Sequence, residues 1–222
     1  MCDTGHGRGV MSIFTEQVET AVDGAYRWLR QEVTSLPWNQ EAHLSESELA
    51  RRSDFSRTPI REALLRLQGD GLIRRLPNRG VVVPALQQAD LDSLMEVREV
   101  IEIWAARKAI AQGMDVTPLR DLLAAQEEAA GDPVEFVRLD VAFHRTIVQR
   151  GRNSVFEDLY EAHRYKQLRL GVQAVEAANR IEAVIGEHRA IVDAIASADP
   201  EAAAEATRRH LSSTARVLTD GR

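Results

Sequence analysis

Residues 44–83 read LSESELARRSDFSRTPIREALLRLQGDGLIRRLPNRGVVV, and the first half of this stretch predicts two helices joined by a short turn. Ser45 and Glu48 have the spacing of a capping box, in which two side chains accept hydrogen bonds from backbone amides at the start of a helix. We expect that helix to end near Ser53. A second helix is expected to start within residues 56–59, because hydroxyl side chains cap helices and proline is tolerated in the first turn.

The second helix is expected to have two different faces. Ile60, Leu64 and Leu67 recur at helical spacing and form an apolar stripe. Arg57 and Arg61 are four residues apart, so they share another face of the same helix. That cationic face is free to enter a groove of DNA. The alternative is that it is the solvated face of an ordinary helical domain.

The second half of the stretch predicts a β-hairpin. Two short β-prone runs, residues 72–76 and 81–83, flank a sequence typical of turns, Pro77, Asn78, Arg79 and Gly80. Residues 51–80 carry eight arginines against three acidic residues, and such a local cationic surface suits phosphate binding even in an acidic chain. Together the two helices and the hairpin form a winged helix-turn-helix, with Arg79 at the tip of the wing.

The stretch SESELARRSDFSRTPIREALLRLQGDGLIRRLPNRGVVV closely resembles the DNA-binding domain of the GntR family of bacterial transcription regulators. Arginine suits such a role because its two donors match two acceptors on the edge of guanine. The resemblance implies contacts to phosphates and bases in the major groove from Ser56, Arg57, Thr58 and Arg61. It also implies that the wing reaches the minor groove through Arg79 and Gly80.

Two positions depart from the pattern of that family. Asp54 stands where the turn between the helices usually carries glycine, and Ser47 stands where an arginine that contacts DNA is common. Aspartate tolerates left-handed backbone better than most residues, so we expect the turn to survive. Ser47 leaves the operator sequence and the affinity for it open.

Composition indicates a soluble protein of two domains. The chain has 222 residues and a formal net charge of −6, and the basic cluster lies in its first third. Cys2 is the only cysteine, so an internal disulfide cannot form. The chain has no apolar run that could span a bilayer and no hydrophobic signal core, so we expect a cytoplasmic protein without a membrane partner. Residues 1–11 are expected to be a disordered tail, and either Met1 or Met11 is the natural start.

Residues 12–84 are assigned to the winged helix-turn-helix domain and residues 85–219 to a helical domain. The first helix is expected at residues 13–33, where Val18, Val22, Ala25 and Leu29 recur at helical spacing. After Pro84 the β pattern ends, and residues 90–112 begin a series of about six helices that should form an antiparallel bundle. The predicted fold class is therefore mainly α, with a small β-hairpin wing.

Four residues of the bundle have metal-ligand chemistry: Asp140, His144, His188 and His210. Asp140 and His144 are four apart on one helix and so project from one face. Three imidazoles and a carboxylate suit a divalent transition metal, with zinc as the first choice and nickel or manganese as alternatives. From spacing alone, histidines on helices are more often packed or solvated than ligating.

The segments RLDVAFHRTIV, NSVFEDLY, EHRAIVDAI and ATRRHL resemble the C-terminal FCD-type ligand-binding domain of the FadR subfamily of GntR regulators. The resemblance implies that Asp140, His144, His188 and His210 hold a metal. It also implies that Arg98 lines an effector pocket, where a guanidinium can hold a carboxylate through two parallel bonds. The alternative is a surface arginine paired with Glu102. His163 lies outside the pattern.

The sequence therefore predicts a ligand-responsive transcription regulator, a repressor that acts as a homodimer on a palindromic operator and senses a small organic acid. One alternative is a metal-dependent enzyme domain fused to a DNA-binding domain. It lacks a second carboxylate as general base, since Glu187 is expected to point away from the face that carries His188. The other alternative is an effector-independent DNA-binding dimer with a structural metal. We expect no catalytic activity.

Overall fold

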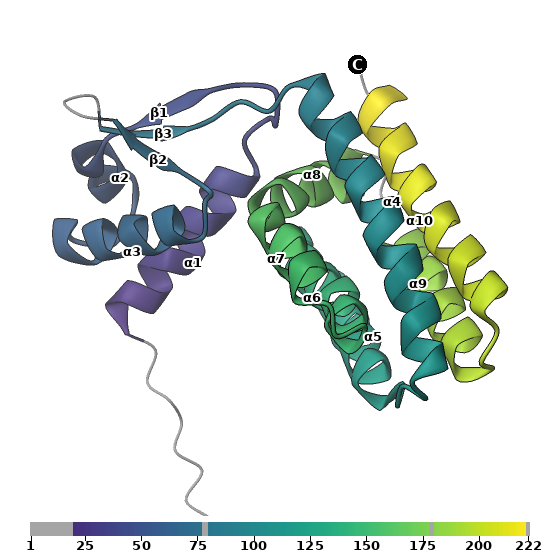
Figure 1. The fold of residues 1–222 in the computed structure, drawn as a ribbon. Coiled ribbons are helices and arrows are strands. Elements are labelled where there is room, and N and C mark those ends of the chain that lie inside the picture. The colour runs from purple at the N-terminus through teal and green to yellow at the C-terminus, as the bar shows by residue number, and fades with distance from the viewer. Residues whose placement is uncertain (1–19, 77–79, 178–179, 221–222) are drawn as a thin grey trace, which may run out of the picture.

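The computed structural model describes residues 20–76, 80–177 and 180–220. Figure 1 shows an N-terminal part, in which helices accompany a small sheet, beside a larger bundle of helices. The predicted tail, the beginning of the first predicted helix before residue 20, and Arg79 lie outside the described residues. The mainly α fold and the order of its two parts are as the sequence predicts.

Three helices build the N-terminal part: α1 (Ala21–Thr34), α2 (Glu46–Arg52) and α3 (Arg57–Gly69). Ser45 caps α2 by accepting a hydrogen bond from the Glu48 amide at 3.1 Å, which is half of the predicted capping box. The predicted stripe of α3 is confirmed, because Ile60, Leu64 and Leu67 are fully buried. The turn between α2 and α3 forms without a left-handed conformation at Asp54. Helices α2 and α3 therefore pack with α1 around a common core.

The three strands form one antiparallel sheet: β1 (Ala42–Leu44), β2 (Arg74–Leu76) and β3 (Gly80–Val83), in the order β1-β3-β2. The sequence did not predict β1, because three residues are too few to show the alternation that indicates a strand. Gly80 begins β3 with φ +77°, and a Cβ there would lie 3.1 Å from the carbonyl oxygen of Leu44. The positive φ and the close approach of this carbonyl oxygen both favour glycine at this end of the hairpin.

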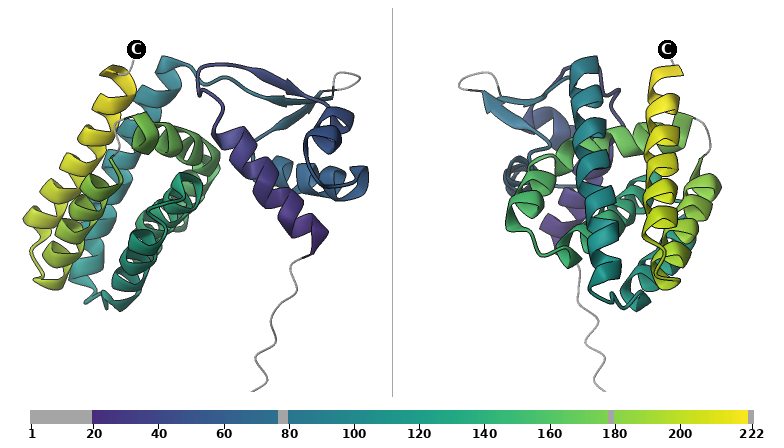
Figure 2. Two further views of the ribbon diagram at one scale, coloured as in Figure 1. Left: turned by 180° about the vertical axis from the view of Figure 1, so that it is seen from behind. Right: turned by 45° about the vertical axis from the view of Figure 1, so that its right-hand side comes forward.

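The bundle contains seven helices in the part of the chain that the structure describes, one more than predicted. They are α4 (Gln88–Ala111), α5 (Thr117–Glu128), α6 (Pro133–Arg150), α7 (Ser154–Ala162), α8 (Arg164–Ala177), α9 (Ile181–Ala196) and α10 (Pro200–Asp220). The additional boundary is at His163, where the backbone leaves helical geometry at φ −107° and ψ 5° without a proline or glycine. As Figures 1 and 2 show, α4 and α10 run side by side, and α8 crosses the end of the bundle that faces α1.

A buried arginine joins the two parts of the chain. Arg169 of α8 is fully buried, and its two Nη atoms donate to the carbonyl oxygens of Pro84 and Pro37, the latter at 3.0 Å. Both carbonyls belong to loops of the N-terminal part. A further bond from the Leu86 amide to the Trp38 carbonyl, at 2.7 Å, closes the same junction. The position of α8 is therefore tied to the loops that carry the sheet.

Among the described residues, no helix is long and apolar enough to cross a membrane.

Candidate metal centre and nucleic-acid interface

Four of the predicted DNA-contacting side chains lie together on the surface at the start of α3. Ser56 is the N-cap of α3, and Arg57, Thr58 and Arg61 follow in its first turns, all four exposed. Gly80 is exposed at the start of β3. Since α3 buries its opposite face in the core, this face of the helix is the one available to a groove.

A carboxylate holds part of the cationic surface. Glu46, in the first turn of α2, contacts Arg61 Nε through Oε2 and Arg75 Nη2 through Oε1, each at 3.1 Å. Arg66, by contrast, is turned toward α1, where it pairs with Asp23 at 2.7 Å and lies over the ring of Tyr26. The predicted cluster of arginines is therefore not a uniform cationic patch, because one acidic side chain already forms ion pairs with two of the arginines.

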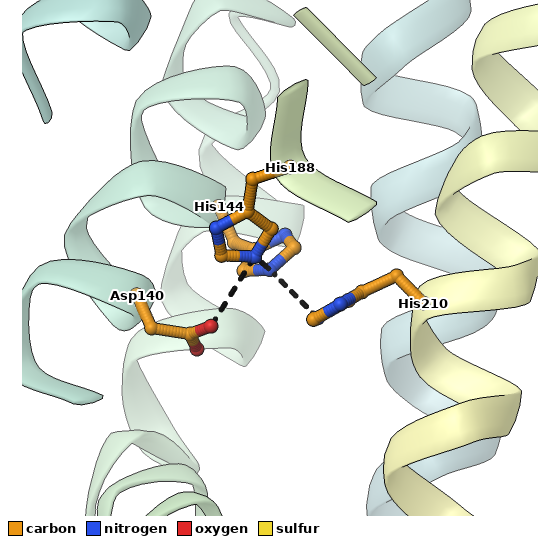
Figure 3. Close-up of side chains that lie close together, drawn as sticks. All are labelled: Asp140, His144, His188 and His210. Atoms are coloured by element: carbon orange, nitrogen blue, oxygen red, sulfur yellow. Dashed lines mark hydrogen bonds and ion pairs between the residues drawn. The ribbon is translucent and has the colours of Figure 1, made fainter. Parts of the chain in front are cut away.

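The structure brings Asp140, His144, His188 and His210 together inside the bundle. Helix α6 supplies Asp140 and His144, α9 supplies His188 and α10 supplies His210, as Figure 3 shows. Nε2 of His144 lies 3.1 Å from Nε2 of His210 and 3.2 Å from Nε2 of His188. Oδ1 of Asp140 lies 3.2 Å from Nε2 of His188. The four side chains therefore turn their potential metal-ligand atoms toward a common centre.

Each histidine is oriented through its other nitrogen. Nδ1 of His144 lies 2.8 Å from Glu102 Oε2, Nδ1 of His188 lies 2.9 Å from Gln126 Oε1, and Nδ1 of His210 lies 2.8 Å from Glu187 Oε2. Glu102 Oε2 lies close to Nδ1 of His144 without the geometry of a hydrogen bond. The oxygens of Gln126 and Glu187 accept a hydrogen bond, so Nδ1 of His188 and of His210 carries the proton and the Nε2 lone pair faces the centre. Metal-binding histidines are held in this way. Three of the distances between ligand atoms are 3.1 to 3.2 Å, and all four atoms lie within 4.8 Å of one another. Three imidazoles and a carboxylate gathered in this way fit a divalent metal.

The electrostatics of the cluster favour neutral imidazoles at His188 and His210 beside a charged carboxylate. Burial lowers the pKa of His188 to about 4 and also lowers the pKa of His210. Burial alone opposes ionisation of Asp140, but its contact with His188 and the nearby His144 and His210 hold the pKa of this carboxyl well below its usual range. These are the protonation states in which histidine and aspartate bind metals.

A cavity of about 20 Å³ lies against the cluster and is lined by Arg98, Asp140 and His210. Arg98 is 6% exposed, and its Nε donates to Glu102 Oε1 at 2.7 Å. The pairing with Glu102 is therefore present, but the alternative of a surface arginine is wrong. The rest of the wall is mostly apolar, so the polar groups are concentrated at a few points.

Sequence reasoning missed the side chains that orient the histidines. Glu187 was expected to point away from the face of α9 that carries His188, but its carboxylate nevertheless reaches the cluster, because it bonds His210 on α10. Glu102 was considered only as a partner of Arg98. A signal was available, since Arg98 and Glu102 are charged residues on the face of α4 that buries Leu94 and Ile101. His163 is partly buried at the end of α7 and is not among the residues that line the cavity.

Two family models match the two parts of the chain. Residues 21–83 match the model described as bacterial regulatory proteins of the gntR family, and residues 93–213 match the FCD domain. The chain is a GntR-family transcription regulator with an FCD domain. The members of this family are transcription regulators and not enzymes, and this GntR regulator is one of them.

Relatives and solved structures agree with this assignment. An HTH-type transcriptional regulator in an unstable DNA locus of Streptomyces ambofaciens is 35% identical over 193 residues, which cover 84% of this chain and 80% of the relative. The repressor RspR of Escherichia coli K12 is 26% identical, over 84% and 83%. A putative GntR regulator from Rhodococcus sp. RHA1 shares the fold with a TM-score of 0.67 at 23% identity, over 89% of this GntR regulator and 97% of that chain.

Proposed function

We propose that this GntR regulator is a homodimeric, ligand-responsive repressor that binds a divalent metal and a small organic acid in its helical domain. The observation that carries the proposal is the convergence of Asp140, His144, His188 and His210 beside a cavity that Arg98 also lines. This arrangement stands in a chain whose N-terminal third matches a DNA-binding family. We place the division between the two domains at residues 84 and 85.

The DNA-binding step is assigned to the exposed N-terminal end of α3. Ser56, Arg57, Thr58 and Arg61 would contact phosphates and base edges in the major groove, and Gly80 would let the wing approach the minor groove together with Arg79. One chain supplies one recognition helix. A palindromic operator needs two such helices at a fixed separation, which favours a homodimer.

The sensing step is assigned to the cavity. Asp140 and the three histidines would hold the metal, with zinc as the first choice and nickel or manganese as alternatives. When bound, the metal supplies a Lewis-acidic position that attracts a carboxylate. Arg98 would hold that carboxylate through its Nη atoms, while Glu102 fixes its Nε.

Helix α8 is the proposed route from the cavity to the DNA-binding domain. Gln167, Leu170, Gly171 and Ala174 of this helix line the cavity, whereas Arg169 on another face binds the loops of the N-terminal part. A ligand changes DNA affinity only if it binds one arrangement of the protein better than another. An acid that pushes α8 outward would therefore also move the carbonyls to which Arg169 is bonded.

The proposal is tested by metal analysis and DNA binding on the same full-length samples. Purified wild-type protein, produced without chelator or nickel affinity resin, should contain about one metal ion per chain by inductively coupled plasma mass spectrometry. His210→Ala should lose most of that metal, because it removes one of four ligands. His163→Ala is the matched control, since it removes a histidine of the same domain that lies outside the cluster, and it should retain the metal.

The response is then measured by fluorescence anisotropy on an operator fragment, with short organic acids added. We expect an acid to weaken operator binding by the wild type and to have a much smaller effect on His210→Ala and Arg98→Lys. Lysine keeps the charge beside Glu102 but loses the planar fork that holds a carboxylate. Full metal content in His210→Ala would refute the metal assignment, and an unchanged response in Arg98→Lys would remove Arg98 from the pocket.

A further inference from the structure

Two polar side chains in the cavity wall have hydrogen-bonding atoms without partners. Gln167 of α8 is 4% exposed, and neither its Oε1 nor its Nε2 has a hydrogen-bond partner among the described residues. Arg180, which precedes α9, is 8% exposed, and its Nη1 is likewise unpartnered within that part of the chain. Both residues line the same cavity as Arg98. Buried polar groups are almost always paired, so these atoms indicate a missing polar partner.

The two arginines of the cavity are held in the same way. Glu102 binds Arg98 and also contacts His144, while Glu187 binds Arg180 at 2.8 and 2.9 Å and also contacts His210. Each guanidinium is therefore fixed by a carboxylate that orients one histidine of the cluster. The guanidinium N–H groups that the carboxylates do not bind are available to a ligand in the cavity.

The charges in the cavity favour an effector with a single negative charge. Arg98 is neutralised by Glu102 and Arg180 by Glu187. Histidine binds a metal as a neutral ligand and so adds no charge, whereas Asp140 would cancel one of the two charges of a divalent cation. One unit of positive charge remains. A single carboxylate neutralises it, whereas a dicarboxylate would bury an extra negative charge, which is costly.

Gln167 has a different requirement from the arginines. Its amide offers a donor and an acceptor at once, and an anion can satisfy only the donor. A hydroxyl group can satisfy both, because it donates one hydrogen bond and accepts others. The cavity of about 20 Å³ has room for roughly one water molecule, so any acid must displace the walls, and a short acid displaces them least.

We propose that Gln167 and Arg180 form a subsite that recognises a hydroxyl group, so that the preferred effectors are short hydroxylated monocarboxylic acids. This inference rests on the proposed function, because the carboxylate of the acid occupies the site at the metal and Arg98. Gln167 and Arg180 determine specificity: they distinguish a hydroxy acid from the corresponding acid without the hydroxyl group.

The test uses pairs of acids that differ only in the hydroxyl group: glycolate and acetate, lactate and propionate, 3-hydroxybutyrate and butyrate. Binding to the zinc-loaded full-length protein is measured by isothermal titration calorimetry. In at least one pair, the hydroxy acid should bind the wild type at least about tenfold more tightly than its partner. Gln167→Met should reduce that ratio to about one while binding of the acid without the hydroxyl group changes little.

Gln173→Leu is the matched control, because Gln173 lies on the same helix and is not among the residues that line the cavity, and it should keep the wild-type ratio. A second variant, Gln167→Glu, keeps the side-chain shape and adds a negative charge, so it should weaken the binding of every acid. Retained preference in Gln167→Met, or equal binding of both members of every pair by the wild type, would overturn the subsite alone. No binding of any acid would overturn the proposed acid sensing, and the subsite with it.

Discussion

Arg61 is an exposed arginine of α3 that we propose reads DNA directly. It lies one turn beyond Arg57 on the face that the core leaves open. If Arg61 reads a base, Arg61→Ala should weaken specific operator binding by about 1 to 3 kcal/mol. Arg66→Ala on the same helix is the control, because Arg66 is turned toward Asp23 and Tyr26. Equal losses in the two variants, measured by fluorescence anisotropy, would place Arg61 outside the interface.

Glu46 would compete with DNA for two arginines of the proposed interface. Its carboxylate contacts Arg61 and Arg75, so phosphates must displace it or approach a partly neutralised surface. Glu46→Gln should therefore tighten operator binding by about threefold to tenfold at low salt and by less at high salt, because salt screens such contacts. Glu48→Gln, on the same helix and without an ion pair among the described residues, should change the affinity little. Weaker binding by Glu46→Gln would show that Glu46 instead positions Arg61.

At the scale of the element, Gly171 controls how closely α8 can pack against α6. A Cβ at Gly171 would lie 2.5 Å from Cγ1 of Val137, and both residues line the cavity. Gly171→Ala should force the two helices apart, lower the free energy of unfolding by about 1 to 3 kcal/mol, and weaken operator binding even without an acid. Urea denaturation and fluorescence anisotropy would measure the two effects.

Gly186→Ala provides the control for that substitution. Gly186 lies in the interior of α9, and a Cβ there would meet no atom within 4 Å. Alanine should stabilise this helix by up to about 1 kcal/mol and leave operator binding unchanged. If Gly171→Ala binds the operator as the wild type does, α8 does not carry the signal.

At the scale of the whole molecule, Arg169 holds the two domains together. Arg169→Met removes a buried charge, which stabilises the fold, but it leaves the carbonyls of Pro84 and Pro37 without their donors, which destabilises it. Because the two effects oppose each other, we expect the free energy of unfolding to change by less than about 2 kcal/mol. The response of operator binding to acid, however, should largely disappear.

The surface ion pair between Arg164 and Asp70 provides the control for Arg169→Met. Its atoms are 3.9 Å apart and partly exposed, so Arg164→Met should alter neither stability nor response. A normal acid response in Arg169→Met would show that the domains communicate through another contact.

The sequence predicted the parts of the molecule that local rules decide. Ser45 caps α2 as its type suggests, and the apolar stripe of α3 is buried as its spacing indicates. The partners of the histidines could not be predicted in this way. Gln126 is 62 residues from His188, and Glu187 is 23 residues from His210. Only the packing of the bundle determines which side chains meet across such separations.

The small volume of the cavity also has a consequence for the speed of the response. An acid of several atoms cannot enter a space of about 20 Å³ until the surrounding helices separate. Opening of the bundle would then precede capture of the acid, and the observed association rate would rise with acid concentration only until it equals the opening rate. Beyond that concentration, more acid would not make the regulator release its operator any sooner.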